Sequence, residues 1–157
     1  MSFIKTIIQT FIASLLLTNI TYAANVVKID NAWSPTAPPV AKVMAGYMHI
    51  YNKSKHPIKI TAAKSPLFRK VEIHLTQMKN GMMSMIKQEN LNIPANQTLE
   101  LKSGGLHMML IGKLKAIKTG SSIPVTLYFD NGESSNIDLL VKEDNEPQMM
   151  HDHHHHH

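Results

Sequence analysis

Histidine and methionine occur together at three places in this sequence of 157 residues. The three groups are His74 with Met78, Met82, Met83 and Met85; His107 with Met108 and Met109; and Met149 and Met150 with His151. A methionine by itself usually fills space in an apolar core. Imidazole nitrogens and thioether sulfurs together, with no thiolate or carboxylate, form a soft to intermediate ligand set that favours Cu(I) over zinc, calcium or magnesium. Whether they form one site depends on the elements that hold them.

The first group lies on a predicted β-hairpin. Asn80-Gly81 is a strong signal for a two-residue type I′ turn, which would pair Lys79 with Met82. In that register His74 and Met85 lie diagonally on one face, about 7–8 Å apart between backbones, a span that two long side chains can close onto one ion. A three-residue loop with a bulge is the alternative, and it would put the two side chains on opposite faces.

The second group follows Gly104-Gly105, which permits a tight turn. His107 and Met109 are two residues apart, so on a strand both point to the same side while Met108 points to the other. We therefore predict a site for one Cu(I) made by His74, Met85, His107 and Met109.

The chain after residue 25 predicts a single all-β domain, a β-sandwich of Greek-key type spanning residues 24–142. Short apolar or alternating runs are separated by turn residues, and no stretch of a dozen residues has a convincing helical period. About 120 residues suffice for one core but not for two. The predicted strands are Val26–Asp30, Gly46–Tyr51, Ile58–Ala62, Val71–Gln77, Met82–Lys87, Thr98–Lys102, His107–Ile111, Pro124–Phe129 and Asn136–Val141.

Residues 1–23 predict a secretory signal peptide. Lys5 gives a positive start, Ile7–Ile20 is an apolar stretch short for a membrane span, and Thr21 and Ala23 fit cleavage after Ala23. An uncleaved anchor is the alternative. The chain has no cysteine, so neither lipid attachment at a cysteine nor a disulfide is available, and packing alone must hold the fold.

Residues 143–157 predict a disordered tail rich in methionine and histidine, because they are too polar to form a core. Imidazole nitrogen suits Cu(II), so the tail is a possible second copper site. An expression tag is the alternative, although Asp152 interrupts the histidines. The tail ligands would be Met149, Met150, His151, His153, His154, His155, His156 and His157.

Composition argues against other functions. Without Lys5, 15 basic residues remain against 11 acidic ones, the lysines are scattered, and aromatic residues make up only 6%, so nucleic-acid binding is not expected. No nucleophile motif, P-loop or paired carboxylates occur, and blue-copper electron transfer needs a cysteine ligand. We expect no enzymatic activity. His49 and His56 are expected to be ordinary surface residues, and Trp33 and Tyr128 to be packing residues.

From about residue 31 to 141 the chain resembles the PCuAC-type periplasmic copper chaperones. Their ligand pattern is a histidine, ten residues, a methionine, twenty-one residues and then His-x-Met, which the four predicted ligands match without a gap. Leu75 departs from the Glu or Met common there. The other matching segments are Val71-Glu72-Ile73-His74, Met83-Ser84-Met85, Ile93-Pro94-Ala95, Leu101-Lys102-Ser103-Gly104-Gly105 and His107-Met108-Met109-Leu110.

The resemblance implies a cupredoxin-like β-sandwich, a periplasmic location and delivery of Cu(I) to a recipient protein. That recipient would be an oxidase subunit, at the CuA centre of a respiratory oxidase, or a second copper chaperone. A monomer is expected. Two alternatives stay open: copper storage or resistance, which the tail would also serve, and a Met-rich β-sandwich that binds proteins and no metal.

Overall fold

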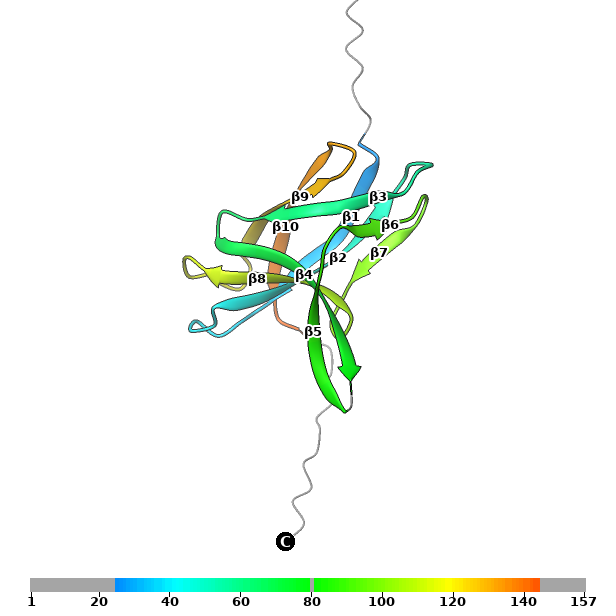
Figure 1. The fold of residues 1–157 in the computed structure, drawn as a ribbon. Helices are drawn as coiled ribbons and strands as arrows, with labels where there is room; N and C mark the ends of the chain where they lie inside the picture. Colours follow the sequence, from blue (N-terminus) through cyan, green and yellow to red (C-terminus); the bar gives the residue numbers. More distant parts are fainter. Residues whose placement is uncertain (1–24, 80, 145–157) are drawn as a thin grey trace, which may run out of the picture.

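The structure is a computed structural model that describes residues 25–79 and 81–144, and it is built from β-strands throughout (Figure 1). Within these residues there is no helix, and hence none with the length and apolar character to cross a membrane. The predicted signal peptide and tail lie outside the described residues. The strands are β1 (Val27–Pro35), β2 (Val43–Asn52), β3 (Ile58–Lys64), β4 (Phe68–Lys79), β5 (Met82–Gln88), β6 (Leu91–Ile93), β7 (Thr98–Leu101), β8 (Leu106–Lys113), β9 (Ser122–Phe129) and β10 (Ser134–Lys142).

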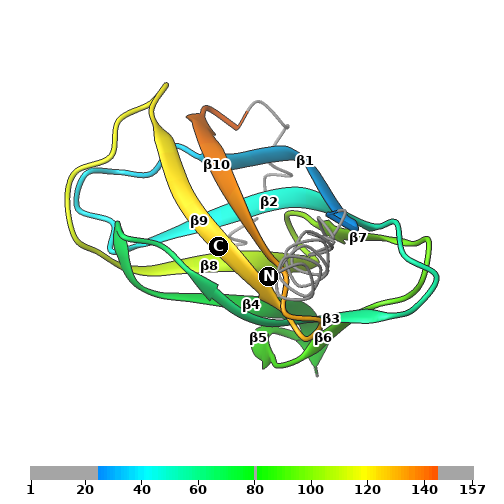
Figure 2. The same cartoon turned by 90° about the horizontal axis from the view of Figure 1, so that it is seen from above.

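Seven of the strands form a closed ring in the order β4-β8-β2-β1-β10-β9-β3, which returns to β4 through one pair, Ala63 with Val71. β5 extends the sheet beyond β4, β6 pairs with β3, and β7 pairs with β2. The pairing of β1 with β10 is parallel, and the other pairings are antiparallel. In Figure 2, β9 and β10 cross over the layer that contains β2, β8 and β4. The predicted all-β sandwich is confirmed.

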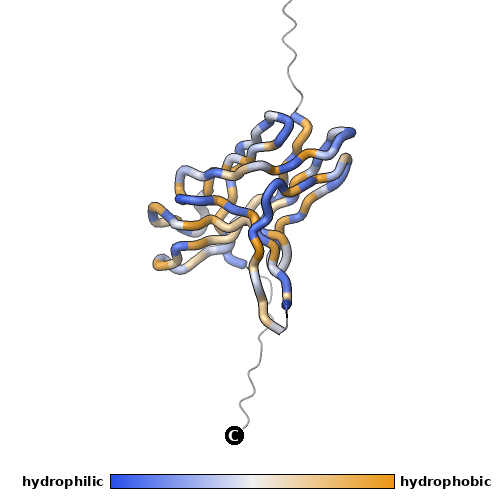
Figure 3. The backbone as a smooth tube through the Cα atoms, in the orientation of Figure 1, coloured by the Kyte–Doolittle hydropathy of each residue, from blue (hydrophilic) through white to orange (hydrophobic). Residues whose placement is uncertain are grey.

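The core lies between these layers. β10 alternates strictly between exposed and buried residues, so Ile137, Leu139 and Val141 all point inward. The same alternation on β2 buries Met48 and Ile50, and the colours of Figure 3 change from residue to residue along the strands accordingly. Burial of one such side chain contributes roughly 1.5–3 kcal/mol. The chain has no cysteine, so this packing replaces a disulfide framework.

All nine predicted strands are present, and one further strand was not predicted. β6 has only three residues, Leu91–Ile93, too few to show an alternating pattern. β1 runs past the predicted end at Asp30 because Asn31 adopts a left-handed conformation (φ 51°), and the register with β2 shifts between Asp30 and Trp33. This bulge lets the strand bend and continue to Pro35.

The β4–β5 hairpin projects from the body of the molecule (Figure 1). β4 is twelve residues long; its part up to Leu75 pairs with β8, and the part from Ile73 to Lys79 pairs with β5. Lys79 pairs with Met82, as the predicted type I′ register requires. Gly81 has a φ of 75°, a conformation that glycine adopts without steric cost.

Candidate metal site

Strand pairing brings the two predicted histidine ligands together. His74 on β4 lies directly opposite His107 on β8, and the centres of their rings are 6.3 Å apart. Met109 follows two residues later on the same side of β8, opposite Glu72. These two central strands therefore supply three of the four predicted ligands to one face of the sheet.

The fourth predicted ligand comes from β5. Met85 lies opposite Thr76, and His74 lies opposite Lys87, so Met85 is the diagonal neighbour of His74. The turn signal at Asn80-Gly81 predicted this register correctly. Since paired residues of neighbouring strands share a face, the four predicted ligands lie on one surface formed by β5, β4 and β8.

A cavity of about 490 Å³ opens at this surface. Three of the four predicted ligands line it, namely Met85, His107 and Met109, while His74 lies beside it across from His107. The opposite wall comes from the β1–β2 connection and from Tyr47, whose ring makes an edge contact with Trp33 at 5.0 Å. The cavity is thus a pocket between the hairpin and the first two strands.

Solvent exposure increases across the predicted ligands. His107 is buried, with 7% of its surface exposed; the His74 side chain is 15% exposed, and Met85 is 54% exposed. An ion held here would therefore be anchored on the protein side at His107 and accessible to other molecules on the side of Met85.

The backbone fixes the orientation of the His107 ring. Its Nδ1 lies 3.0 Å from the carbonyl oxygen of Gly105, and because a carbonyl only accepts, Nδ1 donates its hydrogen. The lone pair of the ring is then on Nε2, which is free to bind a metal. Gly104, with a φ of 72°, and the hydrogen bond from the Lys102 amide to the Leu106 carbonyl at 2.6 Å form the turn that makes this contact possible.

A carboxylate that the sequence analysis did not select orients the other histidine. Nε2 of His74 lies 3.0 Å from Oε2 of Glu72, so it donates to the carboxylate and leaves the lone pair on Nδ1. This hydrogen bond holds the pKa of Glu72 below its usual value, and the charge of Lys87, 3.7 Å away, acts in the same direction. Glu72 is two residues before His74 and so on the same strand face, a signal present in the sequence.

The arrangement suits a soft metal ion better than a hard one. It offers two oriented imidazoles and two thioethers from three strands. Among the described residues, no group of three or more His, Cys, Asp or Glu side chains is placed to hold a metal. The donors that do converge favour Cu(I).

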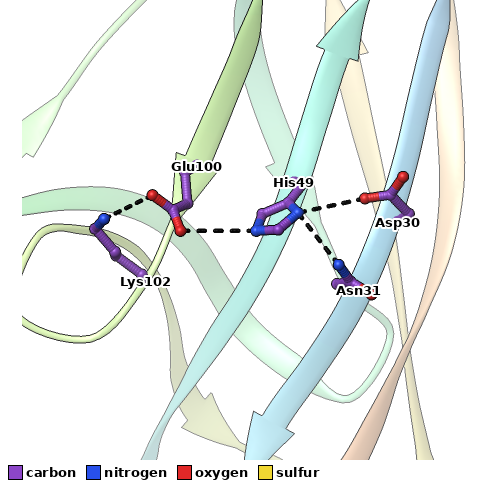
Figure 4. Close-up of polar contacts among 5 residues, drawn as sticks. All are labelled: Asp30, Asn31, His49, Glu100 and Lys102. Carbon is purple, nitrogen blue, oxygen red and sulfur yellow. Dashed lines mark hydrogen bonds and ion pairs between the residues drawn. The ribbon is translucent and has the colours of Figure 1, made fainter.

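His49 lies elsewhere, on the outer face of β2, in a polar network with acidic residues (Figure 4). Its ring nitrogens are 3.5 Å from Asp30 and 3.7 Å from Glu100, and its side chain is 40% exposed. Each of these acids also pairs with a lysine, Lys28 at 2.8 Å and Lys102 at 2.6 Å. His49 is therefore a surface residue, as expected.

Comparison with known proteins places this geometry in context. The model of the LpqE-like family (putative lipoprotein LpqE-like) matches residues 27–141. A putative lipoprotein of Leifsonia xyli subsp. xyli (strain CTCB07) is 31% identical over 121 residues, which cover 76% of this chain and 72% of that protein.

Among the solved structures that are similar over most of the chain, two hold copper. The solution structure of Cu(I)-bound DR1885 from Deinococcus radiodurans is 33% identical, with a TM-score of 0.64 over 82% of this chain and 85% of that one. The copper-bound PCuAC domain of PmoF2 has a TM-score of 0.66 over 78% of this chain and 97% of that one; at 23% identity it supports the fold alone. The cupredoxin-like sandwich expected from the sequence is confirmed.

Proposed function

The chain belongs to the LpqE-like, PCuAC-like family, and from this premise we propose that it is an exported copper chaperone that holds one Cu(I) and passes it to another protein. The observation that supports this most directly is the convergence of Met85, His107 and Met109 on one cavity with His74 beside it. The protein is proposed to bind and transfer its cargo rather than to catalyse a reaction.

The gradient of exposure suggests how transfer would proceed. The ligands are uncharged thioethers and imidazoles, so an incoming donor can replace them one at a time without separating charge. Met85 is the most accessible of the ligands with a described exposure, and an acceptor would displace it first. His107, held by Gly105, would keep the ion in place until the acceptor has made its own bonds.

The test is Cu(I) titration of the mature protein under reducing conditions with a competing chelator. His74→Ala and Met109→Ala should weaken binding greatly and leave the fold intact, because both side chains line a surface rather than the core. His49→Ala is the matched control, a strand histidine outside the cavity, and should bind as the parent does. Unchanged Cu(I) affinity in both site variants would refute the assignment.

A transfer experiment with an acceptor protein distinguishes copper delivery from copper storage. We propose delivery to a CuA centre of a respiratory oxidase or to a second copper chaperone. Mixing the Cu(I)-loaded protein with one equivalent of an apo CuA domain should move copper to that domain. Copper that stays on the chaperone at equilibrium, while a stronger chelator removes it, would indicate storage.

We propose export to the periplasm. The predicted leader supports export, and the Leifsonia relative, which is described as a putative lipoprotein, supports a location in the cell envelope. This chain has no cysteine to receive a lipid, so we propose cleavage after Ala23 and release of residues 24–157. Mass measurement of the N-terminus of the secreted protein tests this directly. A retained leader would indicate an anchor instead.

We further propose that the tail binds Cu(II) independently of the core, through His151 and His153–His157. Residues 145–157 lie outside the described part of the chain. The expected result is that a protein ending at Glu146 loses a Cu(II) site and keeps the Cu(I) site. If truncation removes no Cu(II) site, or if Cu(II) on the tail never reaches the core after a reductant is added, the tail has no part in the mechanism.

A further inference from the structure

The β4–β5 hairpin exposes methionines that the four-ligand site does not use. Met78 is 68% exposed, Met82 70% and Met83 66%, although methionine is a residue type usually found buried. Within the described residues, the only other exposed methionine is Met85, which lies on the same hairpin.

Two of these side chains face each other. Met78 on β4 lies directly opposite Met83 on β5, a position in which the Cβ atoms of antiparallel strands are about 4.5–5.5 Å apart. Two thioethers at that spacing can reach a common ion. The next pair toward the turn is Lys79 with Met82. Because side chains alternate along a strand, Met82 points to the opposite face of the hairpin.

The facing pair is continuous with the proposed copper site. Met83 is two residues from Met85 on the same face of β5, and both line the 490 Å³ cavity together with His107 and Met109. Successive same-face residues of a strand are about 7 Å apart, which follows from the rise of 3.2–3.4 Å per residue. A row of thioethers thus runs from the tip of the hairpin to the cavity.

We propose that Met78 and Met83 form a second, weaker Cu(I) site, with Met85 shared between it and the four-ligand site, through which the ion enters and leaves. This proposal rests on the proposed function and adds a route to it. With thioethers alone the second site should select Cu(I) and exclude Zn(II) and Cu(II), which need nitrogen or oxygen donors for tight binding. Its exposure suits brief occupancy rather than storage.

An apolar docking face would explain exposed methionines in another way, and substitution by leucine separates the two. Leucine keeps the apolar surface and nearly the same volume but removes the sulfur. A docking face would tolerate Met78→Leu and Met83→Leu, whereas a thioether site would be lost. Met82→Leu is the matched control, since it changes an equally exposed methionine of the same hairpin on the opposite face.

The experiment is Cu(I) titration of the full mature protein labelled with ¹³C at the methionine methyl groups, followed by NMR. The first equivalent should shift the signals of Met85 and Met109, and the second those of Met78 and Met83, with Met82 unmoved. In the Met78→Leu/Met83→Leu double variant the second equivalent should bind more weakly by at least about tenfold, because losing a group that merely orients a ligand already costs about 10–100-fold in metal affinity. The rate at which a chelator removes the core Cu(I) should fall as well.

The outcomes distinguish this proposal from the proposed function. If Met85 and Met109 do not shift with the first equivalent, the four-ligand site is wrong whatever the hairpin does. If they shift but Met78 and Met83 stay unmoved through the second equivalent, or if the double variant takes up and releases copper as Met82→Leu does, the core assignment stands and the hairpin site is overturned.

Discussion

Methionines of the barrel and methionines of the projecting hairpin have opposite environments. Met48 and Met108 are 1% and 0% exposed and fill the core, while Met78 and Met83 are two-thirds exposed on the hairpin. The side chain is the same, so its role follows from the strand face that it occupies. In the core its flexibility and apolar volume matter, and on the hairpin its sulfur is available to a metal ion.

β8 contains both kinds of methionine at adjacent positions. Met108 points into the core opposite Ile73, and Met109 points into the cavity opposite Glu72. A shift of one residue in the β4–β8 register would exchange their roles and destroy both the core and the site. The histidines share the constraint, because His107 and Met109 lie on one face only while this register holds.

The largest effect on stability should come from substituting a methionine of the core. Met108→Ala removes a fully buried side chain and leaves a cavity, so we expect a loss of about 2–5 kcal/mol in the free energy of unfolding. Urea denaturation of the apo protein measures it. The fraction that remains folded should still bind one Cu(I). A loss smaller than about 1 kcal/mol would show that the barrel does not depend on this methionine.

A smaller change, of a different kind, is expected at the exposed edge of the cavity. Met85→Leu should weaken Cu(I) binding by at least about tenfold, the smallest cost typical of losing a group that merely orients a ligand, which is equivalent to at least about 1.4 kcal/mol of binding energy. The stability of the apo protein should stay within about 0.5 kcal/mol of the parent, because the side chain is half exposed. Chelator competition and urea denaturation measure the two quantities. Equal loss in both would mean that Met85 acts by packing and not by binding metal.

The next prediction concerns Glu72, beside the candidate site, whose contribution to the stability of the folded protein should depend on pH. Its pKa is lowered in the folded protein, so its contribution to stability is present above the usual carboxyl pKa and disappears as the pH falls through the folded value. Glu72→Gln should therefore cost less than about 1 kcal/mol at pH 7. The difference from the parent should shrink below about pH 4. Urea denaturation across pH 3–7 tests this, and a difference that grows on acidification would contradict it.

The smallest effect should be that of Met82→Leu. This methionine is 70% exposed and faces away from the proposed copper ligands, so stability should change by less than about 0.5 kcal/mol. Cu(I) affinity should be unchanged. A measurable loss of copper binding in this variant would show that the two faces of the hairpin are not distinct.

Local signals in the sequence were enough to predict the arrangement of one half of the candidate site. The Asn80-Gly81 turn determines which β4 residue faces which β5 residue, so the diagonal of His74 and Met85 follows from a few adjacent residues. Likewise, the two-residue spacing of His107 and Met109 predicted that both side chains lie on the same face of a strand. The nine longer strands were predicted for a similar reason, since each is a short apolar or alternating run and turn residues separate most of them.

Contacts between segments distant in sequence could not be read in this way. The pairing of His74 with His107 depends on β4 lying beside β8, which no adjacent residue specifies. Closure of the ring by a parallel β1–β10 pair and by the single Ala63–Val71 pair is also long-range. The spacing of Glu72 and His74 placed both on one strand face. That the carboxylate orients the histidine follows only from the 3.0 Å hydrogen bond in the structure.

The parallel pairing of β1 with β10 also governs when the protein can fold. Trp33 to Pro35 lie against Leu140 to Lys142, so the first strand has one of its two neighbours near the end of the domain. A topology dominated by such distant contacts folds slowly, on the scale of milliseconds to seconds. A chain that emerges N-terminus first cannot close the barrel until residue 142 has arrived.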